Sequence, residues 1–330
     1  MAFPNAIDLK ILSFLDKDAR MPINKIAASL GVSRQLANLR LQRMETEGVI
    51  LGHFTIFDSG VLGFNWYRVL IRLLNVSKAD RQNFIDFLKK HPDIIWFGEV
   101  GGRWDIAVNF ACQGNGAFNT VYEGLSEKFG GFVEEIQILP YVDLFDHSRS
   151  YLNPEDALRK SFFHRLSPVA GLVIDDLDKK IIKKLSLNAR ISYSQLEKDL
   201  EVSRLTIKSR IDKMIKEKII LGFRTFPRLD KIGYQSHMIF LEINKLNKER
   251  ETELYYYLKM IKQVTFVVKH LQSWRVGLEI ETKNEREFQE VLLDIRSHFS
   301  DLISDYDSFP LLQDYAVNYF PKGALEGAEK

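Results

Sequence analysis

The chain alternates between two kinds of hydrophobic pattern. In the segment DLKILSFLDKD the apolar residues stand at positions 9, 11, 12 and 15, which is the spacing of one face of a helix. This helical pattern continues to about residue 47. From residue 67 it gives way to short apolar runs typical of strands, separated by amphipathic helical segments. The same succession starts again near residue 178, so the sequence predicts alternating helical and mixed units.

The two halves of the chain match at a constant offset. Asp8 corresponds to Asp178, a shift of 170 (178 − 8), and the same shift pairs Pro140 with Pro310. The segment GVSRQLANLRLQRMETEGVILG (31–52) aligns without a gap with EVSRLTIKSRIDKMIKEKIILG (201–222). A repeat of this length indicates a duplicated pair of domains and not a solenoid unit.

The helical part of each repeat predicts a helix-turn-helix. Pro22 suits the start of a second helix and Gly31 suits its end. Ser33 is a candidate N-cap for a third helix that runs to about Glu47. In the second repeat Glu201 replaces the glycine, which costs up to about 1 kcal/mol if the backbone is left-handed there.

The mixed part of each repeat predicts strands and helices in the order βαββαβ, a ferredoxin-like arrangement. The strands expected in the first repeat are YRVLIRLLNV, IIWFGEV, WDIAVNF and VEEIQILPYVDLF. Those expected in the second are SHMIFLEI, VTFVVKHL, WRVGLEIE and, at 315–320, YAVNYF. We expect the two βαββαβ domains to pair through their sheets, either within one chain or between chains.

Composition narrows the class of protein. The 330 residues are 45% hydrophobic and 27% charged, which is typical of about two soluble domains. The net charge of +2 is too small to indicate nucleic acid binding by itself, so any basic surface must be local. Cys112 is the single cysteine, which excludes a disulfide framework and a Cys-based zinc site within one chain.

A single cysteine also suits a reducing cytoplasm, where we expect the protein to reside. The start, MAFPNAIDLK, has no charged segment followed by an apolar run, so we expect no signal peptide. Apolar runs such as YRVLIRLL are short and broken by arginine, so we expect no membrane association. The histidines show no metal spacing, and we expect neither metal nor cofactor.

The chain resembles the Lrp/AsnC family of prokaryotic transcription regulators, twice in tandem. The resemblance rests on LDKDAR…IAASLGVSRQLANLRLQRMETEGVI, on LSLNARISYSQLEKDLEVSRLTIKSRIDKMIKEKII and on VGGRWDIAV. It implies helix-turn-helix domains that bind double-stranded DNA, each joined to a small effector and oligomerisation domain. Family members are usually one such unit and self-associate through the βαββαβ domains.

We therefore predict an α+β fold in which two winged helix-turn-helix domains alternate with two ferredoxin-like βαββαβ domains of the dimeric α/β-barrel type. The predicted ranges are 1–60 and 173–230 for the helix-turn-helix domains, 61–147 and 231–322 for the βαββαβ domains, 148–172 for a linker and 323–330 for a tail.

The third helix of the first repeat carries candidate base contacts. Ala37, Leu41 and Met44 form one stripe, which we expect to be buried. Glutamine and asparagine on the opposite side can bond adenine, and arginine can bond guanine. The candidate DNA contacts in this repeat are Ser33, Arg34, Gln35, Asn38, Arg40, Gln42 and Arg43, with Arg40 at the stripe's edge, where it either packs or contacts a phosphate.

The third helix of the second repeat carries lysines instead. Residues 203–218 have six Lys/Arg against Asp212 and Glu217, a net +4, whereas residues 33–47 have three Arg against two Glu, a net +1. Such a helix suits phosphates and not bases. Its candidates are Ser203, Arg204, Lys208, Ser209, Arg210 and Lys213. The alternative for both helices is an ordinary amphipathic helix with a solvated charged face.

The segment EVGGRWDIAV carries the candidate effector site. By resemblance, the family binds small molecules, often amino acids, at this turn, and the matching residues are Gly101, Gly102, Trp104 and Asp105. The alternative is a tight hairpin in which backbone N–H groups satisfy the aspartate. In the second repeat Gln272 and Arg275 replace Gly102 and Asp105, so we expect an effector in the first repeat only.

An enzyme is the second hypothesis. One branch of the superfamily decarboxylates sirohaem and carries a histidine-rich motif of the form VTHNYxRxHxYN. This chain has VTFVVKHLQSWR at 264–275, where Phe266 replaces the first histidine and only His270 lies nearby. We therefore expect a regulator and no catalytic residues.

Overall fold

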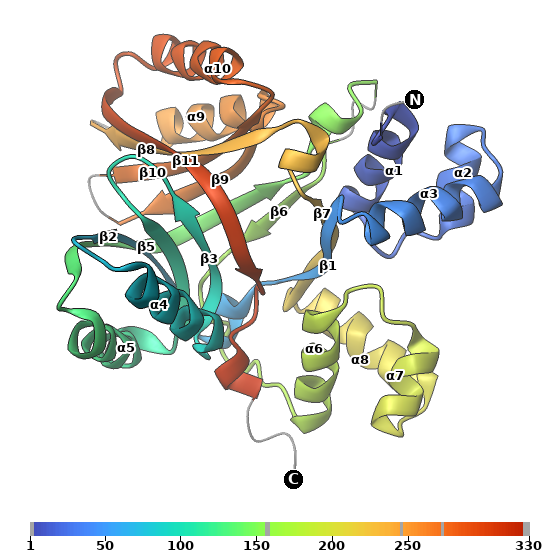
Figure 1. Cartoon of the computed structure of the whole chain (residues 1–330). Helices are drawn as coiled ribbons and strands as arrows, with labels where there is room; N and C mark the ends of the chain where they lie inside the picture. Colours follow the sequence, from blue (N-terminus) through green and yellow to red (C-terminus); the bar gives the residue numbers. More distant parts are fainter. Residues whose placement is uncertain (1–2, 156–158, 245–246, 272–273, 326–330) are drawn as a thin grey trace.

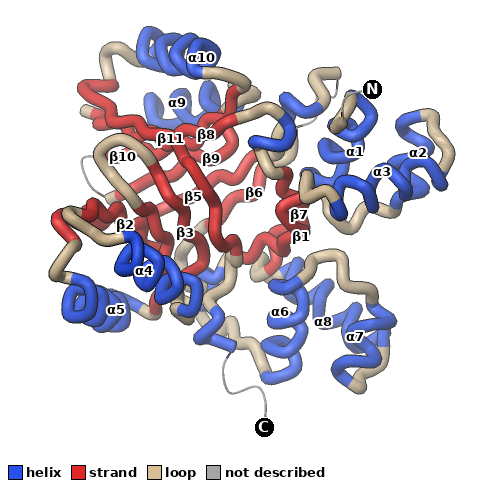
Figure 2. The backbone as a smooth tube through the Cα atoms, viewed as in Figure 1, coloured by secondary structure: helices blue, strands red, loops and turns tan. Residues whose placement is uncertain are grey.

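The computed structural model describes residues 3–155, 159–244, 247–271 and 274–325. A β-barrel forms one side of the molecule. Two helical units lie next to each other on the opposite side of the molecule (Figures 1 and 2). The last described element, a 3-10 helix at Lys322–Leu325, packs against the second helical unit. Within the described residues, no helix is both long and apolar enough to cross a membrane.

Both helix-turn-helix units form where the sequence predicts them. The first consists of α1 (Ala6–Lys17), α2 (Ile23–Leu30) and α3 (Arg34–Thr46), and the second of α6 (Asp176–Leu187), α7 (Tyr193–Leu200) and α8 (Arg204–Lys216). Gly31 ends α2 in the left-handed region at φ 66°. Glu201 adopts the same conformation at φ 55°, so the second unit carries the strain that a glycine would avoid.

The predicted order βαββαβ is confirmed in both repeats. The first contains β2 (Asn65–Leu73), α4 (Lys78–Lys90), β3 (Ile94–Val100), β4 (Ile106–Cys112), α5 (Gly114–Phe129) and β5 (Val133–His147). The second contains β8 (Gln235–Ile243), α9 (Lys248–Met260), β9 (Val264–His270), β10 (Trp274–Thr282), α10 (Glu285–His298) and β11 (Ile303–Val317). The helices cover the outside of the strands, because one side chain in two along each strand points to an apolar layer shared with them.

The two βαββαβ units share one closed barrel. The strand order is β2–β4–β3–β11–β8–β10–β9–β5, and β5 closes the ring by pairing with β2. The long strands make the closure: β5 pairs with β2 through residues 133–140 and with β9 through residues 141–146. Likewise β11 pairs with β8 through residues 303–311 and with β3 through residues 311–317. Of the two expected alternatives, the structure has the pairing within one chain.

A two-stranded ribbon separates the barrel from the helical units (Figure 1). It pairs β1 (Ile50–Phe57) with β7 (Ile220–Pro227) in antiparallel register. Phe54 lies opposite Arg224, which is its own counterpart in the repeat (224 − 54 = 170). The approximate two-fold axis that relates the repeats therefore passes through this pair of residues.

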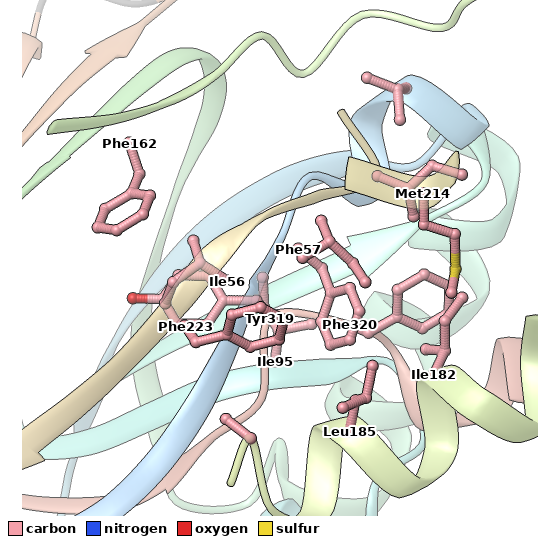
Figure 3. Packing of buried hydrophobic residues seen from close by; sticks show 14 of the residues in the cluster. Ile56, Phe57, Ile95, Phe162, Ile182, Leu185, Met214, Phe223, Tyr319 and Phe320 are labelled. Atoms are coloured by element: carbon pink, nitrogen blue, oxygen red, sulfur yellow. The ribbon is translucent and has the colours of Figure 1, made fainter. Parts of the chain in front are cut away.

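Each helical unit docks on the ribbon strand of the other repeat. The Ala19 N–H donates to the Phe223 carbonyl at 3.0 Å, and the Ala189 N–H donates to the His53 carbonyl at 3.0 Å. Figure 3 shows the cluster around the second unit, which joins the ribbon, α6, α8 and the C-terminal segment. The labelled members of this cluster are Ile56, Phe57, Ile95, Phe162, Ile182, Leu185, Met214, Phe223, Tyr319 and Phe320.

The structure differs from the prediction in two extended segments. The last strand begins at Ile303 and not at residue 315, so that prediction was wrong. Its polar residues and Pro310 do not look like a strand locally, and pairing with β8 and β3 stabilises it. The segment 148–172, predicted as a linker, contains a 3-10 helix (Ser150–Leu152) and β6 (Ser161–His164), which extends the sheet by pairing with β5.

Candidate nucleic-acid interface

The outer face of α3 is exposed as its sequence pattern predicts. Ala37, Leu41 and Met44 are buried, between 0% and 5% exposed. Ser33 caps the helix by accepting a hydrogen bond from the Leu36 N–H at 3.1 Å. Of the candidate DNA contacts in this repeat, Ser33, Arg34, Gln35, Asn38, Gln42 and Arg43 are exposed.

Two arginines of α3 already have partners within the protein. Arg40 contacts the buried carboxylate of Asp8 in α1 at 3.3 Å, so it holds two helices together. Arg43 pairs with Glu47 at 2.8 Å, and its guanidinium lies 4.0 Å from the centre of the Phe3 ring. Arg40 thus packs against α1, one of the two roles expected for it, and its contact with a phosphate stays a prediction. To contact a base, the Arg43 guanidinium must break its ion pair with Glu47 or contact the base and Glu47 at the same time.

The basic side chains of α8 are largely paired with acids. Lys208 contacts Asp212 at 2.5 Å, and both side chains are more than half exposed. Lys213 lies 4.0 Å from Glu217 in the next turn. Arg204 and Arg210 contact acids of other helices, namely Glu197 at 2.5 Å for the first and Asp175 and Asp178 for the second. Ser203 caps the helix and Ser209 is exposed. Asp212 and Glu217 are already counted in the net charge of +4, and the acids of the other helices weaken the local field of α8 further.

A histidine on the ribbon links the first helical unit to the ribbon strand of the second repeat. The His53 ring lies on the ribbon between Thr225, at 2.8 Å, and Glu45 of α3, at 3.0 Å. Burial lowers the pKa of His53, and the nearby Arg190 lowers it further, whereas Glu45 opposes both effects. This contact couples the end of α3 to β7, the ribbon strand of the second repeat.

The predicted effector turn is a tight hairpin that meets the other repeat. Gly102 has φ 79°, and the Gly101 N–H donates to the Pro310 carbonyl of β11 at 2.9 Å. The Asp105 carboxylate accepts a hydrogen bond from the Leu73 N–H at 2.8 Å, as the hairpin alternative expects. Trp104 is 2% exposed and packs in an apolar cluster inside the barrel. Of the second-repeat counterparts, Arg275 is the second residue of β10 and Gln272 lies outside the described residues.

The structure also contains a buried network of charges that our sequence analysis missed. Arg149 holds Glu281 through two bonds of 2.9 and 2.8 Å and contacts Asp16 of α1 at 3.1 Å. Arg224, at the two-fold axis, contacts Asp16 at 2.6 Å and also pairs with Asp146. The network therefore links the barrel, the ribbon and the first helix-turn-helix unit. Glu281 alternates with Glu279 along β10, a pattern that could have identified an inward-facing polar row.

This network borders a cavity of about 70 Å³ inside the barrel, at the end that faces the ribbon. Glu279 faces the cavity, and burial, together with the negative charges of Glu281 and Asp314, raises the pKa of its carboxyl to about 8. Burial likewise raises the pKa of Asp314. None of the four predicted effector residues lines this cavity.

Comparison with known proteins gives the family. Residues 4–50 match a family described as winged helix-turn-helix DNA-binding, and residues 174–215 match the AsnC-type helix-turn-helix domain. The proline dehydrogenase transcriptional activator of Rhizobium radiobacter is 30% identical over 122 residues, 36% of this chain and 77% of that protein. Regulatory protein AsnC of Haemophilus influenzae is 31% identical over 102 residues, 31% of this chain and 67% of that protein.

A solved structure shares the fold over the whole length. The siroheme decarboxylase NirDL matches with a TM-score of 0.60 over 98% of each chain, at 13% identity, which shows the fold alone. The family matches to the DNA-binding domains, together with the regulators of 30% identity or more, carry the assignment. The chain belongs to the Lrp/AsnC family of helix-turn-helix transcription regulators, in a tandem form that carries two such units.

Proposed function

We propose that this regulator binds a specific DNA site with both helix-turn-helix units of a single chain. The observation that carries the proposal is the crosswise docking of the two units, which sets their separation without a second copy of the protein. Two recognition helices held on one scaffold suit two half-sites one helical turn, or a multiple of it, apart. Linking them in one chain raises the effective concentration of the second unit once the first has bound.

The two helices have different tasks in this proposal. The α3 face presents the amides of Gln35, Asn38 and Gln42, which suit the paired donor and acceptor of adenine. The α8 face presents Lys208 and Lys213, which suit phosphates and give affinity that depends on salt. Because acids already neutralise part of the α8 charge, we expect α3 to supply most of the sequence preference and α8 a modest share of the affinity.

Footprinting of the purified full chain on genomic fragments tests the main claim, and we expect a bounded protected site. Uniform protection at every sequence would refute the specific-regulator proposal. Asn38→Ala is then expected to cost about 1–3 kcal/mol at one base position and to relax preference there. Lys208→Ala is expected to weaken binding equally on all sequences and to flatten the salt dependence. Equal effects of the two variants would refute the division of tasks.

We also propose that a small molecule such as an amino acid modulates DNA binding, with the turn of Gly101, Gly102, Trp104 and Asp105 as one candidate position. Because the Asp105 carboxylate is bonded to Leu73, a ligand there would be held mainly by the backbone of the glycine turn. Calorimetry with a panel of amino acids, repeated with Gly102→Ala, tests this position. Heat that is unchanged by the substitution would place the ligand elsewhere.

Since the barrel closes within the chain, we propose that one chain is the equivalent of a family homodimer. Self-association would then use surfaces other than the barrel seam. Sedimentation of the full chain over a range of concentrations measures it, and a monomer that still gives a two-half-site footprint would support the single-chain proposal directly.

The sirohaem decarboxylase hypothesis has less support. Phe266, at the position of the motif's first histidine, lines the barrel cavity. Phenylalanine has no titratable ring nitrogen, so Phe266 cannot take the part of that histidine. Incubation of the purified protein with sirohaem tests this hypothesis, and any decarboxylated product would overturn our preference for a regulator.

A further inference from the structure

The cavity inside the barrel contains a guanidinium group and carboxyl groups that have no ionic partner among the described residues. Arg68 of β2 is 9% exposed, and its guanidinium donates to the Asn109 side-chain oxygen at 2.9 Å and to the Met238 sulfur at 3.6 Å. Both acceptors are neutral. Within the described part of the chain, no carboxylate lies within ion-pair distance of Arg68. A buried cation without a counter-charge is costly, so its retention calls for an explanation.

Two carboxyl groups that line the same cavity also lack an ionic partner in the ranges that the structure describes. Glu279 accepts from the Ser236 hydroxyl at 3.0 Å, and Asp314 accepts from the Trp96 indole N–H at 2.8 Å. Both donors are neutral, and among the described residues neither carboxylate has a cation within ion-pair distance. The adjacent Glu281, in contrast, is fully matched by Arg149. The cavity thus has a complete ion pair at its edge and unmatched groups of opposite sign in its wall.

These charges break the symmetry of the duplicated chain. At the offset of 170, Arg68 corresponds to Met238, Glu279 to Asn109 and Asp314 to Leu144. Each of these ionisable groups therefore occurs once, and its counterpart in the other repeat is uncharged. A barrel built from two identical chains would carry each charge twice, so this arrangement depends on the fusion of two different repeats.

We propose that this cavity is a single, chemically asymmetric binding site for a small molecule that carries both a carboxylate and a protonated amine. The carboxylate is held by Arg68, and the ammonium is held by Glu279 and Asp314. The rings of Trp96 and Tyr141, whose centres lie 5.3 and 5.7 Å from the Arg68 guanidinium, form aromatic walls of the site. The cavity is small, about 70 Å³, so we expect a small ligand.

The site is placed to act on the helix-turn-helix units. Leu51 and Phe226 of the ribbon line the cavity together with Arg149. Arg149 in turn holds Asp16 of α1, whereas the second unit has Ser186 at the position of Asp16. A bound ammonium next to the Glu279–Glu281 row therefore changes the field at Arg149 and acts on the first unit. This consequence rests on the proposed function, but ligand binding itself does not.

Calorimetry on the full chain tests the site with glycine, β-alanine and γ-aminobutyrate, which differ in the distance between their charges. Acetate and methylammonium serve as the single-charge probes. We expect at least one of the three zwitterions to bind, and each single-charge probe to bind at least about tenfold more weakly, because it leaves one buried charge unmatched. If none of the three zwitterions gave a measurable heat of binding, the proposal would be overturned. So would acetate or methylammonium that binds as tightly as the best zwitterion.

Two variants locate the binding. Arg68→Met introduces the residue that the other repeat has at this position, and we expect about a tenfold or greater loss of affinity. Arg72→Met removes an exposed arginine from the same strand and is the matched control, with unchanged affinity expected. If Arg68→Met is unfolded under the conditions of the binding measurement, Glu279→Gln takes its place in the test. This substitution keeps the shape of the side chain and is expected to weaken zwitterion binding similarly. Wild-type affinity in every folded variant of Arg68 and Glu279 would overturn the proposal. DNA binding is measured separately without ligand, so a failure of the regulator proposal leaves this result interpretable.

Discussion

The Arg20 guanidinium donates to the Ala189 carbonyl at 3.1 Å, and the counterpart Arg190 donates to the Ala19 carbonyl. Each arginine thus ties its own helix-turn-helix unit to the backbone of the other. Arg20 also lies 5.0 Å from the centre of the Tyr193 ring, in the second unit. Burial lowers the pKa of both guanidinium groups, as expected where arginines lie close together away from water. This reciprocal pair makes the distance between the two recognition helices a property of the fold.

From this pair we predict that DNA spacing is enforced by the protein. With wild-type protein, inserting five base pairs between the half-sites should greatly weaken binding, because it turns one half-site to the opposite face of the duplex. The double substitution Arg20→Ala, Arg190→Ala should reduce that penalty and lower the free energy of unfolding by a few kcal/mol. Gel-shift titration on the two DNA lengths measures the first effect and urea denaturation the second. Arg72→Ala, at an exposed ion pair, is the control. A spacing penalty that is the same in the double variant would contradict the prediction.

A second prediction concerns the acid within the basic helix. Asp212 contacts Lys208 at 2.5 Å, so Asp212→Asn should free one positive charge for a phosphate. We expect tighter binding to all DNA sequences and a salt dependence that is steeper by about one charge. Affinity measured at several salt concentrations on specific and random DNA gives both values. Glu290→Gln removes the acid of a similar exposed pair on α10 and should change neither. If Asp212→Asn instead lost preference at one base pair, the carboxylate would be a base contact.

A third prediction follows from the left-handed residue that ends α7. Glu201 has φ 55°, where glycine has no steric cost and other residues do. Glu201→Gly should therefore raise the free energy of unfolding by up to about 1 kcal/mol, less the greater freedom that glycine gives the unfolded chain. Glu201→Ala keeps the Cβ atom and serves as the control, since it removes the charge without relieving the strain. Thermal unfolding of the three proteins decides between them. Equal gains in both variants would show that charge and not backbone strain is the cause.

The sequence predicted the individual helices and strands better than it predicted which strands pair with one another. Capping residues and periodic apolar positions determine α2 and α3, and both helices occur where Gly31 and Ser33 indicate. Strand β11 was predicted too short, because its polar residues become a strand only between β8 and β3, which lie far away in the chain. Barrel closure within one chain depends on the same long-range pairing. A single sequence could show that two sheets must pair, but not which copy supplies the partner.

The candidate site shows the same limit. Exposure of Asn38 and Gln42 follows from helical periodicity, so it could be predicted. The partners of Lys208 and Arg43, one helical turn away, could also have been found from the spacing of acids along each helix. The ionisable side chains of the barrel cavity could not be predicted, because Arg68 and Glu279 come from different repeats and line one cavity only when the barrel closes.

The last prediction uses the carboxyl group of Glu279. Its pKa in the folded protein is about 8, above the ordinary value of 4.5, because burial and the charges of Glu281 and Asp314 disfavour ionisation. The folded state therefore keeps a proton that the unfolded chain loses above pH 4.5. This group destabilises the fold progressively as the pH rises from 4.5 to 8 and has a constant effect above that range.

Glu279→Gln cannot ionise, so it should become more stable relative to the wild type across the same window. Each unit of separation between folded and unfolded pKa corresponds to about 1.4 kcal/mol, so the total difference should reach several kcal/mol by pH 8. Urea denaturation at pH 5, 6.5 and 8 measures it, and because the comparison is between two proteins, the other titrating groups largely cancel. Glu290→Gln, which changes an exposed glutamate on α10, should run parallel to the wild type. Parallel curves for Glu279→Gln as well would mean that Glu279 is already ionised in the folded protein at neutral pH. Such a result would contradict the prediction, because ionised Glu279 would then cost the folded protein no more than it costs the unfolded chain.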